Sequence, residues 1–410
     1  MEPSTEKLPN KIVFNNAFAF SIAFAAWVMF GPSIRVIAQE FGLSASEAAF
    51  IKVVPILTGS ILRIPVGIIT DRIGARRTFS SLLILGAFAA FFMPFLSTAF
   101  SFVVAGLVLG LVGTTFVVGV QSVSSWTPPG KQGLALGIFG AGNVGTAITT
   151  LGMPLLLGIV GWQVAFRIYA VVLFVVGVGY LFMVQDAPQK GARPSLKSLL
   201  EPAKSPVSWM FGLYYTASFG VFVATTLLIG DIYIDQYGLD LPTTGLIVTS
   251  FTFTASLSRI PGGALADRFG SQKLLLVSLP MIALTLAPVV MSPPLYITAI
   301  LFFISALFMG FAMAATFKAI PARFPGRVGV IGGLVGAIGG LGGFYLPLVG
   351  AYAATTLGAA SWQVLPLVSV ALIATSVAIG DALRSAKPAL AGAVNKVERS
   401  ISSSRLTAVH

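Results

Sequence analysis

Two arginines interrupt apolar segments at matching positions in the two halves of the chain. Arg63 opens the stretch RIPVGIITDRIGARR, and Arg259 opens RIPGGALADRFGSQK, 196 residues further along. A guanidinium is permanently charged, and its forked donors match the planar geometry of an oxyanion. An arginine at the middle of a bilayer is unfavourable by at least ~2.5 kcal/mol. Two of them at equivalent positions therefore predict a binding site for a small anion.

The acidic residues are not placed to neutralise these two arginines. All 13 Asp and Glu residues lie near the ends of the predicted spans or in polar segments. Arg63 precedes Asp71 by eight residues, and Arg259 precedes Asp267 by the same number, so each arginine lies ~12 Å into the membrane from its loop. Snorkelling of a long side chain to the interface is the competing explanation. An anion that enters and leaves can supply the missing charge in both copies.

The composition around these residues is that of an integral membrane protein. Of the 410 residues, 56% are hydrophobic and 9% are charged, whereas soluble domains carry about 25% charged residues. The chain has no cysteine, and its one histidine is His410. Disulfides, metal sites built on cysteine or histidine, and histidine-dependent catalytic triads are therefore excluded. We expect no cofactor, no metal and no enzymatic activity.

Apolar runs long enough to cross a bilayer recur along the whole chain, since about 20 apolar residues are needed for one crossing. The predicted spans cover 12–35, 48–70, 78–97, 99–124, 131–158, 162–184, 206–230, 243–265, 273–292, 294–320, 327–353 and 361–384. Lysines and arginines concentrate in alternate connecting segments, which places both termini in the cytoplasm and the protein in the cell's inner membrane. This distribution explains the net charge of +12, so nucleic acid is not an expected partner.

A repeat of local signals divides the predicted spans into two halves. The segment PPGKQG at 128–133 matches FPGRVG at 324–329, and GWQV around Trp162 echoes SWQV around Trp362. Transporters are often built from two such repeats, with the substrate bound between them near mid-membrane. We predict an all-α membrane protein of twelve helices in two bundles. The expected units are an N-terminal six-helix bundle (1–184), a cytoplasmic linker (185–205), a C-terminal six-helix bundle (206–385) and a cytoplasmic tail (386–410).

The charged segment after each arginine has a recognisable spacing. The pattern Gly-x-x-x-Asp-Arg-x-Gly resembles the cytoplasmic loop signature of the major facilitator superfamily. Aspartate in this position can pair with an arginine or cap a neighbouring helix, and such a contact could hold the two halves together in one conformation only. A static anchor is the alternative. The predicted gating residues are Asp71, Arg72, Arg76, Asp267 and Arg268.

Two glycine-rich runs narrow the resemblance further. GAGNVGT at 140–146 and GAIGGLGG at 336–343 allow close helix packing and a small pocket. Together with both arginines they resemble the paired signatures of the nitrate/nitrite porter family. One departure is visible: the first run contains a single polar residue of this kind, an asparagine, whereas family members have a second polar residue nearby. From these runs we expect Gly142, Asn143 and Gly340 at the substrate, and we take Gly340 as the counterpart of Asn143 in the second half.

The resemblance covers essentially the whole chain and implies the remaining site residues. In that family two arginines hold the anion, and rings from the fourth and seventh helices wall it, which here implies Phe116, Tyr215 and Phe219. Tyr215 and Phe219 are four residues apart and can share one helix face. The implied substrates are nitrate and nitrite, carried across the lipid bilayer by a monomer.

Several mechanisms remain open on the sequence. Exchange of nitrate for nitrite is favoured, because no carboxylate or histidine that could couple transport to protons lies in the middle of a predicted span. Nitrate/proton symport, transport of another small monovalent anion, and a receptor built on a transporter scaffold are the alternatives. Three further cations, Lys52, Arg167 and Lys318, are expected at the membrane interfaces.

Overall fold

The computed structural model describes residues 7–187 and 201–357, together with residues 369 and 373, and every regular element in this part is helical. The first half consists of α1 (Lys7–Trp27), α2 (Phe30–Phe41), α3 (Ala45–Ile61), α4 (Arg63–Ile73), α5 (Ala75–Phe92), η1 (Met93–Phe95), α6 (Ala99–Gly110), η2 (Leu111–Thr114), α7 (Thr115–Trp126), η3 (Pro129–Lys131), α8 (Gln132–Gly140), η4 (Ala141–Asn143) and α9 (Val144–Met183).

The second half repeats this arrangement. It consists of η5 (Glu201–Lys204), α11 (Pro206–Tyr215), η6 (Thr216–Gly220), α12 (Val221–Tyr237), α13 (Leu241–Leu257), α14 (Arg259–Phe269), α15 (Ser271–Leu286), η7 (Ala287–Met291), α16 (Leu295–Arg323) and α17 (Val328–Leu357). The predicted twelfth span, 361–384, the tail from 386 and most of the predicted linker lie outside the described residues. The division into domains therefore stays a prediction.

Several elements follow one another as single crossings. Within the described residues, eight helical runs are long and apolar enough to span a membrane, and the pair α3 and α4 makes a ninth when counted as one bent span. The run Pro129–Met183 contains 55 residues, which would be ~80 Å long as a straight helix. The chain instead turns at Gly161, whose φ of 75° and ψ of 166° are not helical. The predicted boundary between 158 and 162 is thereby confirmed.

The arginines stand at breaks within two of these spans. The axes of α3 and α4 differ by 44°, and α4 begins with Arg63. A helix break at the equivalent position separates α13 from α14, which begins with Arg259. Pro65 and Pro261 explain both, because proline has no N–H to donate to the carbonyl four residues earlier. Each break sets an arginine at the start of a new helical segment.

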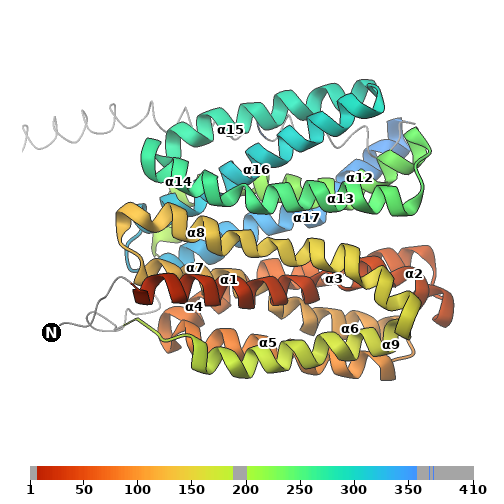
Figure 1. Ribbon diagram of the computed structural model, residues 1–410, viewed down its shortest axis with the longest axis horizontal. Coiled ribbons are helices and arrows are strands. Elements are labelled where there is room, and N and C mark those ends of the chain that lie inside the picture. Colours follow the sequence, from red (N-terminus) through yellow and green to blue (C-terminus); the bar gives the residue numbers. More distant parts are fainter. Residues whose placement is uncertain (1–6, 188–200, 358–368, 370–372, 374–410) are drawn as a thin grey trace, which may run out of the picture.

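The long helices lie side by side along one axis, with α1–α9 forming one layer of the molecule and α11–α17 the other (Figure 1). Several pairs of helices pack across the boundary between these halves, most extensively α4 on α17 and α8 on α14. Glycines allow the close approach, since a Cβ on Gly137 would overlap the carbonyl of Arg259, and one on Gly333 would overlap the carbonyl of Arg63. The arginines therefore lie in the interface between the halves.

Candidate functional site

Both arginines are buried in the interface between the halves. Arg63 has an exposed fraction of 0% and Arg259 one of 2%. Neither guanidinium reaches lipid or headgroups, so the snorkelling explanation is wrong for both. A permanent charge in such surroundings requires compensation by a partner or by several oriented dipoles.

The hydrogen bonds of the two guanidiniums are reciprocal across the interface. Arg63 Nη1 donates to the carbonyl of Gly336 at 2.6 Å, and Arg259 Nη1 donates to the carbonyl of Gly140 at 3.1 Å. The repeat offset of 196 residues separates Arg63 from Arg259, and it also separates Gly140 from Gly336. Arg63 Nη2 also lies 3.4 Å from the carbonyl of Gly113. The arginine of each half thus donates a hydrogen bond to the glycine-rich run of the other half.

No carboxylate contacts either guanidinium among the described residues. The ion pairs found there join Lys318 to Asp267 and Arg327 to Glu201. Acidic side chains that lie outside this description are those of Glu2, Glu6, Asp231, Asp381 and Glu398. In the part of the chain that the structure describes, the two buried cations are therefore held by neutral carbonyl dipoles and aromatic rings, and no carboxylate compensates their net charge.

Aromatic rings fill the space between the arginines. The ring centre of Phe116 lies 5.4 Å from Arg63 Cζ and 5.5 Å from Arg259 Cζ. Phe219 lies 5.6 Å from Arg63 Cζ, and its ring stacks on Tyr215 with centroids 4.9 Å apart. Arg259 Nη2 donates to the Tyr215 hydroxyl at 3.3 Å. The three rings implied by the resemblance are thus brought together with both arginines, and the expected common face of Tyr215 and Phe219 is observed.

Two features of this aromatic group were not predicted. Phe317, from α16, packs edge-on against both Phe116 and Tyr215, with each pair of centroids 4.7 Å apart. Its position in a uniformly apolar span gave no signal. The segment Thr216–Gly220 is a π-helix, a bulge that is frequent at functional sites. It directly follows Tyr215 and contains Phe219, so it sets where both rings point.

The glycine-run residues divide into those near the arginines and those that only pack. A Cβ on Gly340 would lie 3.2 Å from Arg63 Nη1, so its lack of a side chain leaves room for the guanidinium. Gly142 instead packs against Phe20 of α1, and its nearest neighbours do not include an arginine. Both amide atoms of Asn143 are buried and have no hydrogen-bond partner among the described residues.

The assignment of Gly340 as the counterpart of Asn143 needs correction. The constant offset of 196 residues places Gly339 opposite Asn143. Gly339 packs against Tyr215, because a Cβ there would overlap that ring. The two halves therefore differ at this position: the first has the amide of Asn143, and the second has a glycine that packs against the ring of Tyr215.

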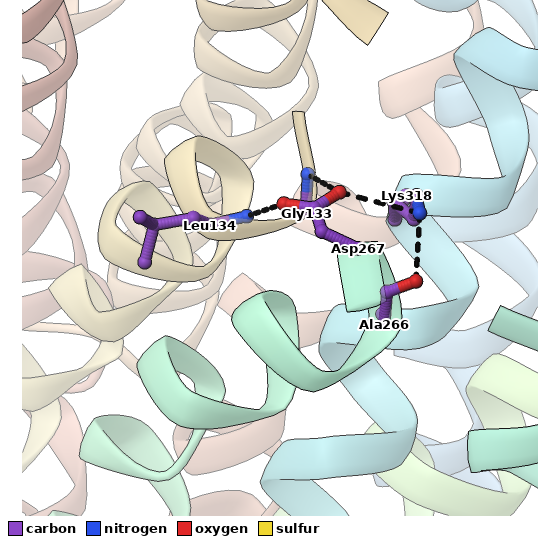
Figure 2. Close-up of polar contacts among 5 residues, drawn as sticks. All are labelled: Gly133, Leu134, Ala266, Asp267 and Lys318. Atoms are coloured by element: carbon purple, nitrogen blue, oxygen red, sulfur yellow. Dashed lines mark hydrogen bonds and ion pairs between the residues drawn. The ribbon is translucent and has the colours of Figure 1, made fainter. Parts of the chain in front are cut away.

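The two aspartates of the loop pattern lie across the interface from helix N-termini. Asp71 accepts a hydrogen bond from Val330 N at 3.1 Å, in the first turn of α17. Asp267 accepts from Gly133 N at 2.9 Å and from Leu134 N at 2.8 Å, in the first turn of α8 (Figure 2). A carboxylate in this position satisfies free N–H groups and interacts favourably with the helix dipole. Both contacts join one half to the other.

The second of these contacts contains a cation that the first does not. Lys318 Nζ lies 3.2 Å from Asp267 Oδ1 and donates to the carbonyl of Ala266 at 2.7 Å (Figure 2). The position was expected to be interfacial, but its side chain is only 16% exposed and belongs to this network. Ser122 occupies the equivalent place in the first half and accepts a hydrogen bond from Asn16. The two contacts are therefore chemically unequal.

The three arginines of the loop pattern do not cross the interface. Arg72 and Arg268 are exposed, and the Arg268 guanidinium lies over the ring of Phe269 at 5.1 Å. The backbone N–H of Arg76 donates to Asp186 at 2.9 Å within the same half. Among the described contacts, Asp71 and Asp267 thus have partners in the opposite half. The contacts found for these arginines lie within their own half.

A cavity of about 210 Å³ lies between the halves on the side of the arginines opposite to the aspartates. Helices α1, α2, α3 and α9 line it from one half, and η6, α12 and α13 from the other. Phe219 belongs both to this cavity and to the wall of the arginine site. Lys52 lines the cavity as well, whereas the sequence suggested a position at the membrane surface. Arg167 lies over the ring of Phe95 at 5.5 Å.

Comparison with known proteins places this arrangement in a family. The profile of the "Major Facilitator Superfamily" matches residues 17–241 and 210–407. The chain belongs to the Major Facilitator Superfamily. It is similar in structure to the transporter FucP in its outward conformation, with a TM-score of 0.69 over 89% of this chain and 98% of that one, at 16% identity. The predicted all-helical fold of two bundles is confirmed.

Curated relatives within the superfamily narrow the comparison. The chain is 34% identical to "Probable nitrate/nitrite antiporter NarK1" of Thermus thermophilus over 85% of this chain and 86% of that protein. It is 32% identical to "Nitrite extrusion protein" of Bacillus subtilis (strain 168), over 85% and 88% respectively. "Probable nitrate transporter NarT" of Staphylococcus haemolyticus is 29% identical over 82% and 88%. The resemblance predicted from the arginines and glycine runs is confirmed.

Proposed function

We propose that this superfamily member carries nitrate and nitrite across the membrane by alternating access, exchanging one for the other. One observation carries the proposal: two fully buried guanidiniums lie between the halves, with no carboxylate in contact among the described residues. A small planar oxyanion supplies the missing charge and matches the donor geometry of arginine. The names of the relatives support these substrates.

The aromatic rings fit the shape of such an anion. Phe116, Tyr215 and Phe219 present flat faces beside the two arginines. Flat walls suit a planar ion. Gly340 has no side chain, so nothing from that position narrows the site or displaces Arg63. We infer that a tetrahedral phosphate does not fit and that nitrate and nitrite do.

Exchange follows from the charge of the site. Closing the empty site would bury two like charges without water, which is strongly unfavourable. Closing the loaded site leaves less uncompensated charge. The carrier therefore changes sides readily with an anion bound and slowly without one, so that outward movement of one anion is coupled to inward movement of another.

The aspartate contacts support a conformation in which one side is closed. Asp71 and Asp267 hold the halves together on that side, whereas the cavity next to Phe219 lies on the other. We propose that the aspartates face the cytoplasm of a cell whose inner membrane holds the protein, with both termini inside, as the charge distribution predicts. We further propose that the monomer is the transporting unit, since both arginines come from one chain.

The test is counterflow in proteoliposomes of the purified full-length protein. We expect nitrate to enter only when nitrite or nitrate is inside, and an imposed pH gradient to leave the rate unchanged. Nitrite should compete with nitrate, and chloride and formate should compete weakly. Nitrate entry into empty liposomes, driven by a proton gradient, would instead establish proton symport. Strong competition by chloride would point to a porter for another monovalent anion.

A further inference from the structure

Ser60 carries a hydroxyl that the fold buries and leaves unpaired. The residue has an exposed fraction of 0%, and Ser60 Oγ has no hydrogen-bond partner among the described residues. Buried polar atoms are almost always paired, and an unpaired one requires an explanation. Serine in a helix has an easy remedy, because its hydroxyl can donate to the carbonyl four residues earlier. For Ser60 that acceptor is Ile56, and the bond is not made.

The equivalent serine in the other half behaves differently. Ser256 stands 196 residues after Ser60, three residues before Arg259 as Ser60 stands three before Arg63. Its hydroxyl donates to the carbonyl of Thr252 at 2.7 Å. The same local backbone option exists in both helices, so helix geometry alone does not explain why Ser60 is unpaired. Its side chain is turned away from its own helix.

The Ser60 hydroxyl points toward the arginine site. It is the nearest atom to the place where a Cβ on Gly340 would stand, and Arg63 Nη1 lies 3.2 Å from that same place. Gly340 belongs to α17 of the opposite half, so the hydroxyl faces across the interface beside the guanidinium. The glycine is what allows these groups to meet.

A second donor beside Ser60 is unpaired in the same way. Arg63 Nε is buried and has no hydrogen-bond partner among the described residues. A cluster of unpaired donors next to a buried cation attracts a negatively charged acceptor, because each hydrogen bond to an ion is stronger than one between neutral groups. Here the unpaired donors are one hydroxyl and one guanidinium N–H.

From this arrangement we infer that the Ser60 hydroxyl donates a hydrogen bond to the oxyanion held between Arg63 and Arg259. The inference rests on the proposed function and adds to its site a residue that no sequence pattern singled out. Ser256 has no such role, since its hydroxyl is already committed to its own helix. The two halves therefore contribute equal arginines but unequal hydroxyls.

The experiment compares S60A with the matched variant S256A in the purified full-length protein. The melting temperature is measured at increasing nitrate concentrations to give an apparent Kd. The KM for nitrate is measured in the exchange assay. We expect S60A to raise both about tenfold, the effect of one hydrogen bond to a charged group. S256A should change either constant by less than about twofold, because its bond lies outside the site.

The melting temperature without nitrate separates folding from binding. S60A should melt at or above the wild-type temperature, because it removes an unpaired buried hydroxyl. A wild-type apparent Kd in S60A would overturn the inference while leaving the proposed function intact. An equal loss of affinity in S60A and S256A would also overturn it, since packing would then explain both. If the wild-type protein shows no nitrate-dependent shift, the proposed function fails and the inference fails with it.

Discussion

Arg63 donates through Nη1 to the carbonyl oxygen of Gly336 at 2.6 Å, and this bond joins one half of the molecule to the other. Its counterpart joins Arg259 to Gly140. The carbonyls orient the two guanidiniums but carry no net negative charge. An anion placed between the arginines can therefore stabilise the interface, and the charge of the site is coupled to how closely the halves approach.

Replacing either arginine by lysine should abolish exchange while leaving the protein folded. Lysine keeps the charge but offers a single compact ammonium in place of a planar fork, so it loses either the cross-half carbonyl bond or the second contact to the anion. For R63K and R259K we expect counterflow to fall at least about a hundredfold, consistent with two charge-assisted hydrogen bonds. R268K is the control, because Arg268 is exposed and contacts the ring of Phe269. Normal nitrate exchange by R63K would contradict the proposed binding geometry.

Phe116 should matter through its ring and not only its volume. Its π face lies within 5.5 Å of both guanidinium carbons, and each such contact stabilises a desolvated cation by about 2 kcal/mol. F116L keeps an apolar side chain of similar size but removes that attraction. We expect the apparent Kd for nitrate to rise about tenfold or more.

The matched control for this prediction is F139L. Phe139 stacks on Phe116 with centroids 5.8 Å apart, and neither arginine lies over its ring among the described contacts. F139L should lower the melting temperature through lost packing while changing nitrate affinity little. Equal affinities in F116L and the wild type would show that the ring only fills space.

Closing of the side that holds the aspartates depends on glycine contacts. A Cβ on Gly67 would overlap the carbonyl of Gly329, a backbone atom that cannot easily move. G67A should disfavour the closed arrangement by ~1–3 kcal/mol, the usual effect of overpacking, and slow exchange by about tenfold or more. G130A is the control, since nothing lies within 4 Å of that position.

A cysteine reporter can follow this opening directly, because the chain has no cysteine of its own. Val120 is 1% exposed and packs beside Gly332 of the opposite half. A maleimide that cannot cross membranes should therefore label V120C slowly from the side that holds the aspartates, and faster when G67A is added. Unchanged labelling in the G67A background would argue against a role for this contact in closure.

The two aspartate contacts should differ in their response to neutralisation. D267N leaves the mostly buried Lys318 without its ion-pair partner, whereas D71N weakens a hydrogen bond from the start of α17 and leaves no ion-pair partner behind among the described contacts. Losing one member of a largely buried ion pair is more destabilising than weakening a hydrogen bond between a carboxylate and a backbone N–H, here by roughly 1–3 kcal/mol after allowance for exposure. The melting temperature of D267N should therefore fall further than that of D71N.

Lys318 supplies the control for this difference. Removing the lysine as well should restore part of the stability of D267N, because no buried charge then remains unpaired. A double-mutant cycle with K318M measures the coupling energy between the two residues. A coupling near zero would mean that Asp267 acts only through Gly133 and Leu134.

The sequence by itself determined the class, the membrane spans of the described part and the two arginines. These follow from composition, from the length of apolar runs and from a repeat, all of which act locally along the chain. The depth of Arg63 and Arg259 could be judged because each stands a fixed number of helical residues from its charged loop. Phe116, Tyr215 and Phe219 came from the resemblance, since nothing else distinguishes them among 32 phenylalanines and nine tyrosines.

Only the tertiary structure decided which groups meet across the interface. Ser60, Phe317 and Lys318 lie in apolar or interfacial stretches whose residue types gave no functional signal, and Lys52 lines the cavity between the halves. Ser256 pairs with its own helix, whereas Ser60 faces Arg63. The position of Ser60 depends on the space left by Gly340, nearly 300 residues away in the sequence. Such contacts arise from the approach of two backbones far apart in sequence, and no local pattern records which side chains that approach will bring together.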